Sequence, residues 1–581
     1  MNNSTFSGNS AQIGYGGGIF NSGTATVSNS TLSGNQAPGF NNGGGAIANS
    51  GILTINGSTR ITNNSAYNGG GILSLPLTST TPQVTIESGT TVADNSATFG
   101  GGIYNSFGGI FNIAGSTLSG NSAANGGAIF NQSSTNFNLS NSSLINNSAS
   151  ATGGGIFNEV SGGLTLNSST LSGNTAGSNG GGIQNNGTAA IAGSTIDANT
   201  ATDLGGGIAQ TAAGATLTIT NSTFTNNRAN SNTNQGGGAI VTTNGTTTID
   251  NSTLSGNSTP GFGGAINSGG GTVIIRNSTL NSNSANVGGA IASSANVTIE
   301  NSTVSGNSAQ FGGGIYNFVN TLVLRNITVS GNNAVLDGGG VLNDSGSVTI
   351  SRSIIAGNNA SAGSEVNSRP NILTSGGNNL FGFSGNAGLV GVTTVASDIV
   401  PAFPLSQILA PLGNYGGPTQ TIAILPGSPA INAAGAGATT TDQRGVPTVG
   451  IRDIGAYEFT GVALTASSGS GQSTTVNTTF TNPLTITLTE TAFNRPLAGV
   501  AVNFAAPPST ASAFLNTNTV TTDSNGQASV TARANIFAGS YAVAATNGTA
   551  SATAILSMRI ILTKIFILNS YQWLEYPFCR S

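Results

Sequence analysis

The sequence contains no histidine, and its single cysteine, Cys579, lies among the last three residues. A disulfide framework within the fold is therefore excluded, and so is a metal site built from histidine and cysteine ligands. Charge is also scarce, because only 5% of the 581 residues are charged and the formal net charge is −4. With no basic run to hold a polyanion, nucleic acid is not an expected partner. We expect neither a metal nor any other cofactor.

Low charge and 88 glycines do not make this chain a disordered one. Disordered segments carry more charge and lack patterned apolar residues. Here 37% of the residues are hydrophobic, and they recur at regular positions, so the chain can bury a core.

A phrase of the type Ser-Thr-Leu-Ser-Gly-Asn recurs fourteen times in residues 1–358, at intervals of 24 to 31 residues. The residue three positions before its final Asn is apolar in every copy, which predicts that this column faces the core. The final Asn stands at positions that include Asn9, Asn35, Asn121, Asn174, Asn257 and Asn307.

A second phrase, Gly-Gly-Gly/Ala-Ile-x-Asn, separates the copies of the first, as at 16–21 and 312–317. A third short apolar stretch, such as 272–275, precedes the next copy. Three short alternating strands per repeat, with Gly and Asn between them, predict an all-β fold, a right-handed parallel β-helix of about 14 coils. We interpret the invariant Asn column as stacked amides that hydrogen-bond along the axis.

Two outward columns accompany these strands. The position seven before the Asn reads Asp250, Arg276, Glu300 and Arg325 in successive repeats, which predicts a surface charge ladder. Each exposed pair should contribute only about 0–1 kcal/mol. The position four before the Asn is mostly Thr; an outward Thr ladder could bind glycan or ice, but β-branched hydroxyl residues also suit an exposed strand. The neighbouring outward column, two before the Asn, varies in residue type. That irregularity favours a structural role for the Thr column over a binding role.

Enzymatic β-helices need clustered acids, often with Lys or Arg. Residues 1–358 contain nine acids and no Lys or His. Two acid pairs flank turns, Asp197 with Asp203 and Asp337 with Asp344. We expect neither pair to have a basic residue beside it. Surface solubility is their expected role, and we assign no catalytic residues.

The residues 6–9 and 224–227, with the Gly-Gly-Ala-Ile runs at 44–47 and 263–266, resemble polymorphic outer-membrane protein repeats. That resemblance implies a secreted or surface-exposed β-helix, often adhesive. Most repeats have Leu, Ile or Val where that family has Phe.

Residues 359–460 resemble the choice-of-anchor Q domain of bacterial surface proteins, through the stretches 412–421, 426–432, 441–445 and 452–458. We expect this region to cap the helix. Its dense charge cluster could be a catalytic or Ca²⁺ site, but nearly balanced signs favour an internal ion-pair network. The cluster comprises Asp442, Arg444, Arg452, Asp453 and Glu458.

Residues 461–557 resemble an invasin-type bacterial Ig-like sandwich, through alternating stretches such as 484–489 and 500–504 and the turn at 522–526. Residues 558–581 hold the only Lys and Trp, Lys564 and Trp573, and read as an aberrant, disordered or frameshifted tail. The chain opens in mid-repeat, so we expect an export signal to be missing from this reading frame.

These features predict a non-enzymatic, extracellular or cell-surface stalk that is monomeric. Extracellular glycans or other surface proteins are the expected partners, and no membrane span is expected. The alternative is a carbohydrate-active β-helix, a polysaccharide lyase or hydrolase, with its site in missing coils or near Asp442–Glu458.

Overall fold

The computed structural model describes residues 1–39, 43–77, 81–132, 137–231, 235–369, 373–436, 440–508, 510–547 and 553–561. They form two compact units. The first comprises Met1–Ile424 and Ser428–Phe459, and the second comprises Leu425–Gly427 with the chain from Thr460 onward.

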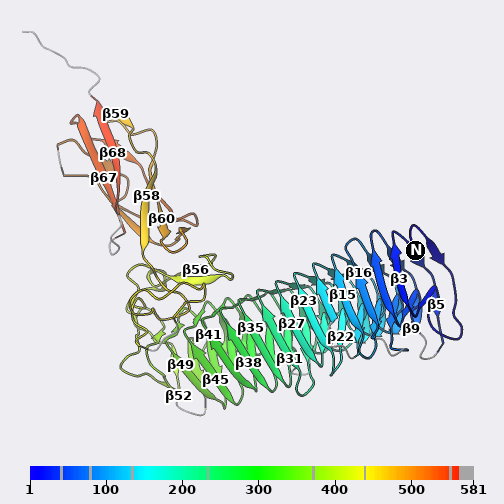
Figure 1. The fold of residues 1–581 in the computed structure, drawn as a ribbon. Helices are drawn as coiled ribbons and strands as arrows, with labels where there is room; N and C mark the ends of the chain where they lie inside the picture. Colours follow the sequence, from blue (N-terminus) through cyan, green and yellow to red (C-terminus); the bar gives the residue numbers. More distant parts are fainter. Residues whose placement is uncertain are drawn as a thin grey trace, which may run out of the picture. The chain divides into compact units, whose positions relative to one another are not determined.

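The first unit is a parallel β-solenoid of about 14 turns, in which each coil adds one strand to each of three long sheets. Figure 1 shows these coils stacked in chain order from the blue strands to the green ones. Sheet 2 has 15 strands from β2 (Ile19–Asn21) to β54 (Leu389–Val390), and sheet 3 has 13 from β3 (Thr24–Ser28) to β49 (Ser347–Ser351). Sheet 1, the sheet that concerns function, contains β1 (Thr5–Ser7), β4 (Thr31–Ser33), β8 (Arg60–Thr62), β12 (Thr91–Ala93), β16 (Thr117–Ser119), β20 (Ser143–Ile145), β24 (Thr170–Ser172), β28 (Thr195–Asp197), β32 (Thr223–Thr225), β36 (Thr253–Ser255), β39 (Thr279–Asn281), β42 (Thr303–Ser305), β46 (Thr328–Ser330), β50 (Ile354–Ile355) and β53 (Leu380–Phe381).

The apolar columns of the repeat form the core of this solenoid. In sheet 1 the middle residue of each strand points inward, and equivalent residues pair directly, as Leu118 does with Leu144 and Leu144 with Leu171. Together with the inward residues of sheets 2 and 3 they form one continuous buried cluster. The predicted parallel β-helix is therefore confirmed at the level of fold, because a period-2 pattern repeated in every coil fixes which side chains face inward.

The column of final Asn residues lies inside the coils and forms a continuous amide ladder. Asn174, fully buried, accepts hydrogen bonds at Oδ1 from the main-chain N–H and the Nδ2 of Asn147, at 3.0 and 2.9 Å. Its own Nδ2 donates to Leu144 O and to Asn199 Oδ1, at 3.0 and 2.8 Å. Equivalent amide-to-amide bonds join Asn9 to Asn35, Asn121 to Asn147, Asn257 to Asn283, and Asn307 to Asn332.

A second interior ladder follows the last residue of the sheet 2 strands, and sequence reasoning missed it. Asn105 donates to Asn131, Asn131 to Asn158, and Asn158 to Asn185, at 2.8–3.0 Å. The sequence does contain a signal for this ladder, because the second phrase ends in Asn in most repeats. The solenoid thus satisfies interior polar side chains coil by coil instead of excluding them from the core.

The glycine run before each sheet 2 strand permits neighbouring coils to approach closely. A Cβ on Gly154, for example, would lie 2.3 Å from Gly181 O and 2.4 Å from Thr175 O. Any side chain there would push the coils apart. The residue immediately before the first phrase, which is Asn in many repeats, has a different constraint: Asn141, Asn221 and Asn251 all have φ of 48–49°, in the left-handed region that Asn tolerates.

Residues beyond Asn358 complete the solenoid and then turn back along its side. β51 (Val366–Ser368), β53 and β54 extend the sheets, followed by β55 (Val392–Thr393) and the 3₁₀ turn η1 (Leu405–Gln407). The hairpin of β56 (Leu409–Gly413) and β57 (Thr421–Ile424) begins a stretch that packs against the outward face of sheet 1. From residue 409 this region, which was predicted to cap the helix, lies along the side of the solenoid as a lateral cover.

The second unit consists of short sheets that are mainly antiparallel. β60 (Leu484–Glu490) pairs with β58 (Val462–Ser468), β61 (Arg495–Pro496) and β65 (Gln527–Val530). A five-stranded sheet contains β59 (Ser473–Thr475), β62 (Ala501–Ala505), β64 (Thr519–Thr521), β67 (Gly539–Thr546) and β68 (Thr553–Ile561), and β63 (Ala513–Leu515) pairs with β66 (Ala532–Ala534).

β68 extends to Ile561, past residue 558, where the aberrant tail was predicted to start. Residues 562–581, with Lys564, Trp573 and Cys579, lie outside the described residues. Within the described ranges no helix has the length and apolar character needed to cross a membrane.

We predict that Asn174→Ala lowers the free energy of unfolding by roughly 2–4 kcal/mol, because it leaves the buried N–H groups of Asn147 and the carbonyl of Leu144 without their partner. Asn138→Ala is the matched control: Asn138 also donates to an amide one coil away, Asn112, but on the exposed surface. The control should cost less than about 0.5 kcal/mol. Denaturant unfolding of both variants measures this, and equal losses would contradict the ladder's role.

Candidate functional site

The four residues of the predicted charge ladder lie in register on sheet 3. Asp250 pairs with Arg276, Arg276 with Glu300, and Glu300 with Arg325. Glu300 accepts from Arg276 at 3.3 Å and from Arg325 at 3.4 Å, whereas Asp250 accepts from the amide of Asn277 at 2.8 Å. Both arginines are about half exposed, so these ion pairs contribute little energy and are not a binding site in themselves.

Asp337 and Asp344, which were expected to have no basic residue nearby, both contact an arginine. Arg369 bonds Asp337 at 2.5 Å and Asp344 at 3.3 Å, and its guanidinium lies 5.5 Å from the ring centre of Phe311. The expectation was wrong because Arg369 lies outside the repeat, one coil further along the chain. Burial raises the pKa of the neighbouring Tyr316 hydroxyl, and the charge of Asp344 adds to that rise. Asp197 accepts from the Thr225 hydroxyl and the Asn226 amide, and Asp203 accepts from the Ser178 hydroxyl.

The densest predicted charge cluster lies in the lateral cover, which we define as residues 409–424, 428–436 and 440–459. Its central pair is buried: Arg444 Nε donates to Asp442 Oδ2 at 2.8 Å. Asp442 also accepts from the main-chain N–H groups of Arg444, Val446 and Glu458 at 2.8–3.0 Å. The guanidinium lies 3.6 Å above the ring of Tyr457. The pair therefore organises a loop and is almost fully withdrawn from solvent.

The other charged side chains of the cluster bind backbone groups more than one another. Asp453 accepts from the N–H of Asn432 at 2.6 Å and of Phe459 at 2.5 Å. Glu458 accepts from the N–H of Val449 at 2.8 Å and of Asp453 at 3.0 Å. Burial raises the pKa of Asp453 to about 7 and lowers that of Arg452. The predicted ion-pair network thus has one close ion pair among the described residues, with carboxylate-to-backbone bonds around it.

This cluster fixes the lateral cover to sheet 1. Gln443 accepts from the Thr303 hydroxyl at 2.6 Å and donates to the Thr279 hydroxyl at 3.0 Å, so one amide bridges two coils. The Thr303 and Thr421 hydroxyls are 3.0 Å apart, and Thr279 donates to Gln420 O.

Further bonds extend the contact over the next coils. Arg452 donates to Asn301 Oδ1 at 3.3 Å and to Thr441 O. Arg352 donates to the carbonyls of Ala434 and Ala436, at 3.2 and 2.8 Å. The charged cluster therefore serves the attachment of the cover, and its five charged residues are each no more than 5% exposed.

The cover divides the outward Thr column of sheet 1 into two parts. Thr279, Thr303 and Thr328 are buried beneath it. From Thr5 to Thr253 the same column is half-buried or exposed. At the boundary lies a groove of about 220 Å³, lined by Thr223 and Thr253 from sheet 1 and by Asn414 and residues 417–420 from the cover.

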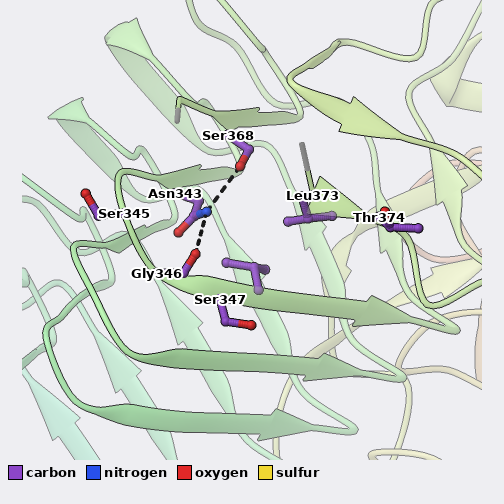
Figure 2. Close-up of a pocket in the computed structure, with 8 residues that line it drawn as sticks. Asn343, Ser345, Gly346, Ser347, Ser368, Leu373 and Thr374 are labelled. Atoms are coloured by element: carbon purple, nitrogen blue, oxygen red, sulfur yellow. Dashed lines mark hydrogen bonds between the residues drawn. The ribbon is translucent and has the colours of Figure 1, made fainter. Parts of the chain in front are cut away.

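A larger hollow, of about 360 Å³, opens where sheet 3 ends (Figure 2). Asn343 donates there to Gly346 O at 3.0 Å and to Ser368 Oγ at 3.1 Å. β52 (Leu373–Thr374) contributes the remaining wall. Its lining of Asn, Ser, Thr, Gly, Val and Leu supplies no ionisable group for acid–base chemistry. Among the residues that the structure describes, no three His, Cys, Asp or Glu side chains gather where they could hold a metal ion.

The first amide ladder ends at a carboxyl group. Glu365, 1% exposed, accepts from the N–H of Gly357 at 2.9 Å and from the N–H and Nδ2 of Asn358 at 3.2 and 2.6 Å. Burial raises its pKa to about 7 in spite of these donors.

A family model described as a right handed beta helix region matches residues 182–318. The matched stretch lies wholly within the stack of coils, so the chain contains a right-handed parallel β-helix. No curated protein matches the chain. The β-helix fold occurs in adhesin-like and in carbohydrate-active proteins, and the match does not choose between them.

We predict that Asp442→Ala destabilises the first unit by about 3–5 kcal/mol, because it leaves the Arg444 charge buried without its partner. Glu300→Ala, which breaks the exposed ladder, should cost about 0–1 kcal/mol. Chemical denaturation compares the two. A loss for Asp442→Ala as small as that for Glu300→Ala would show that the buried pair does not hold the cover.

We predict that stability falls as pH rises, partly through Glu365. Its folded pKa of about 7 lies above the ordinary 4.5, so the folded state binds the extra proton. The contribution is complete below about pH 4.5 and is lost as pH rises through about 7. Melting temperatures across this range should fall less steeply in Glu365→Gln, which cannot titrate. Part of the slope should remain, since Asp453 titrates in the same direction; an unchanged slope would contradict the assignment.

Proposed function

We propose that this chain is a non-enzymatic, secreted or cell-surface stalk of the adhesin type, whose β-helix carries an extended binding face. The observation that carries the proposal is the burial of the cluster Asp442–Glu458, which was the alternative catalytic site. The acids of this cluster accept hydrogen bonds from main-chain N–H groups, and its arginines donate to carbonyls and to Asn301. These bonds hold the lateral cover in place. A polymeric substrate has no access to carboxyl groups that are 0–1% exposed.

The other parts of the chain fit this role. We assign residues 359–460 to a choice-of-anchor Q-like region and residues 461–557 to an Ig-like spacer, as their sequence motifs suggest. The antiparallel pairing of β58, β60 and β65 and of β62, β64 and β67 supports the second assignment. We propose an extracellular or surface location, with glycans or surface proteins as partners of a monomeric chain.

One observation favours the alternative, a polysaccharide lyase or hydrolase. Asp337, Asp344 and Arg369 meet on neighbouring coils, with side chains 27%, 38% and 36% exposed. Acids beside an arginine on one face are what such chemistry requires. However, a single guanidinium holds both carboxylates, an arrangement that suits a clamp between coils more than a general acid.

The full chain should release no new reducing ends and no unsaturated sugars from plant, algal or bacterial polysaccharides. Protease treatment of intact producing cells should remove it, because we place it on the surface. Release of sugar that Asp337→Asn abolishes would overturn the non-enzymatic role and establish the alternative. Retention of the chain inside protease-treated cells would overturn the location. Arg276→Gln, in an exposed ion pair elsewhere, is the control for both measurements.

A further inference from the structure

We propose that the uncovered part of the outward sheet 1 face, between β4 and β36, binds a neutral polysaccharide chain laid along the solenoid axis. This deepens the proposed function, on which it rests, by naming the class of partner and the residues that meet it.

On this face the column four before each ladder Asn is rich in hydroxyls, whereas the outward column two before that Asn varies and includes Ala93, Ile145 and the charged Asp197. The column four before each ladder Asn presents a hydroxyl in every strand from β4 to β36 except β8, where Arg60 stands. The strands pair in parallel and in register, so these hydroxyls repeat once per coil, at roughly 4.8 Å. This repeat is comparable to the length of one sugar ring in an extended polysaccharide. The hydroxyls belong to Thr31, Thr91, Thr117, Ser143, Thr170, Thr195, Thr223 and Thr253.

The lateral cover shows what the same column binds where it is occupied. Thr279 and Thr303 are met by one hydroxyl, one carbonyl and both ends of the Gln443 amide. Thr328 accepts from the N–H of Ala456 at 3.1 Å. The column therefore donates and accepts hydrogen bonds toward a neutral polar chain that passes from coil to coil. The groove beside Thr223 and Thr253 lies where this covered stretch meets the open one.

A polysaccharide fits the open stretch better than a second peptide does. Extended peptides bind sheets chiefly by adding a strand to an exposed edge. On this face the main-chain groups of each strand already pair with the coils on both sides, so only side chains, chiefly hydroxyls, are offered. The covering peptide is held by the buried charges of its own loop, which a separate peptide would lack. A neutral sugar chain offers hydroxyl donors and acceptors along its whole length.

Each coil adds only a weak hydrogen bond. Binding must therefore depend on many coils at once, and affinity should rise steeply with ligand length.

The experiment measures binding of the full chain to soluble β-1,3-glucan and cellulose-type polymers and to their oligosaccharides, with polygalacturonate as the acidic comparison. We expect at least one neutral polymer to bind, its hexasaccharide to bind at least about tenfold more weakly, and polygalacturonate not to compete. The triple variant Thr117→Val, Thr170→Val and Thr195→Val should weaken polymer binding at least about fivefold, because it removes three hydroxyls and keeps the β-branched shape.

The matched control is Thr165→Val, Thr218→Val and Thr248→Val, which removes outward hydroxyls from sheet 3. It should bind polymer like the unaltered chain, and all three proteins should melt alike. The proposal is overturned by absence of neutral-polymer binding, by equal loss in both triple variants, or by stronger binding of polygalacturonate. Displacement by a peptide with the sequence of residues 414–421, or variant-sensitive self-association, would also overturn it by naming another occupant. None of these outcomes changes the result expected in the reducing-sugar test or in the protease test. A surface stalk that does not bind this ligand can therefore be distinguished from failure of the proposed function.

Discussion

The interior amide ladder is the interaction on which the rest of this structure depends. Each ladder Asn bonds the main chain and the side chain of its neighbours, so a coil that shifted by one residue would lose several buried hydrogen bonds together. The ladder therefore fixes the position of every coil relative to the next. The outward columns are aligned as a consequence: the charge ladder on sheet 3 and the hydroxyl face on sheet 1 are regular because the interior is.

The two outward columns illustrate how the same regular scaffold serves different ends. Where the lateral cover is attached, neutral Thr hydroxyls meet Gln443 and Thr421, and buried charges behind this contact hold the covering loop in shape. Elsewhere the column is open. Several charged groups take part in attachment or in clamps such as Arg369 with Asp337 and Asp344. The open part of the sheet 1 face carries few charges, on Arg60 and Asp197.

Periodicity explains what sequence reasoning could and could not predict. The strands, the inward columns, the Asn ladder and the alignment of Asp250, Arg276, Glu300 and Arg325 all follow from spacing that repeats in every coil. Arg369 and the lateral cover lie outside the repeat, so their positions depend on single, non-local contacts that no period reveals. The burial of Asp442 and Arg444 also depends on such non-local contacts. The balance of charges suggested an ion-pair network, but it could not show which coils the network packs against.

The equivalence of successive coils has a consequence for how such a chain can change its length. A segment that runs from one ladder Asn to the next, such as residues 148–174, presents the same hydrogen-bonding surfaces at both ends. Loss or duplication of that segment in the gene would join surfaces that already match, and no new interface would have to evolve. The reach of the molecule is therefore a quantity that unequal recombination between repeats can adjust in whole steps, while the lateral cover and the second unit stay unaltered.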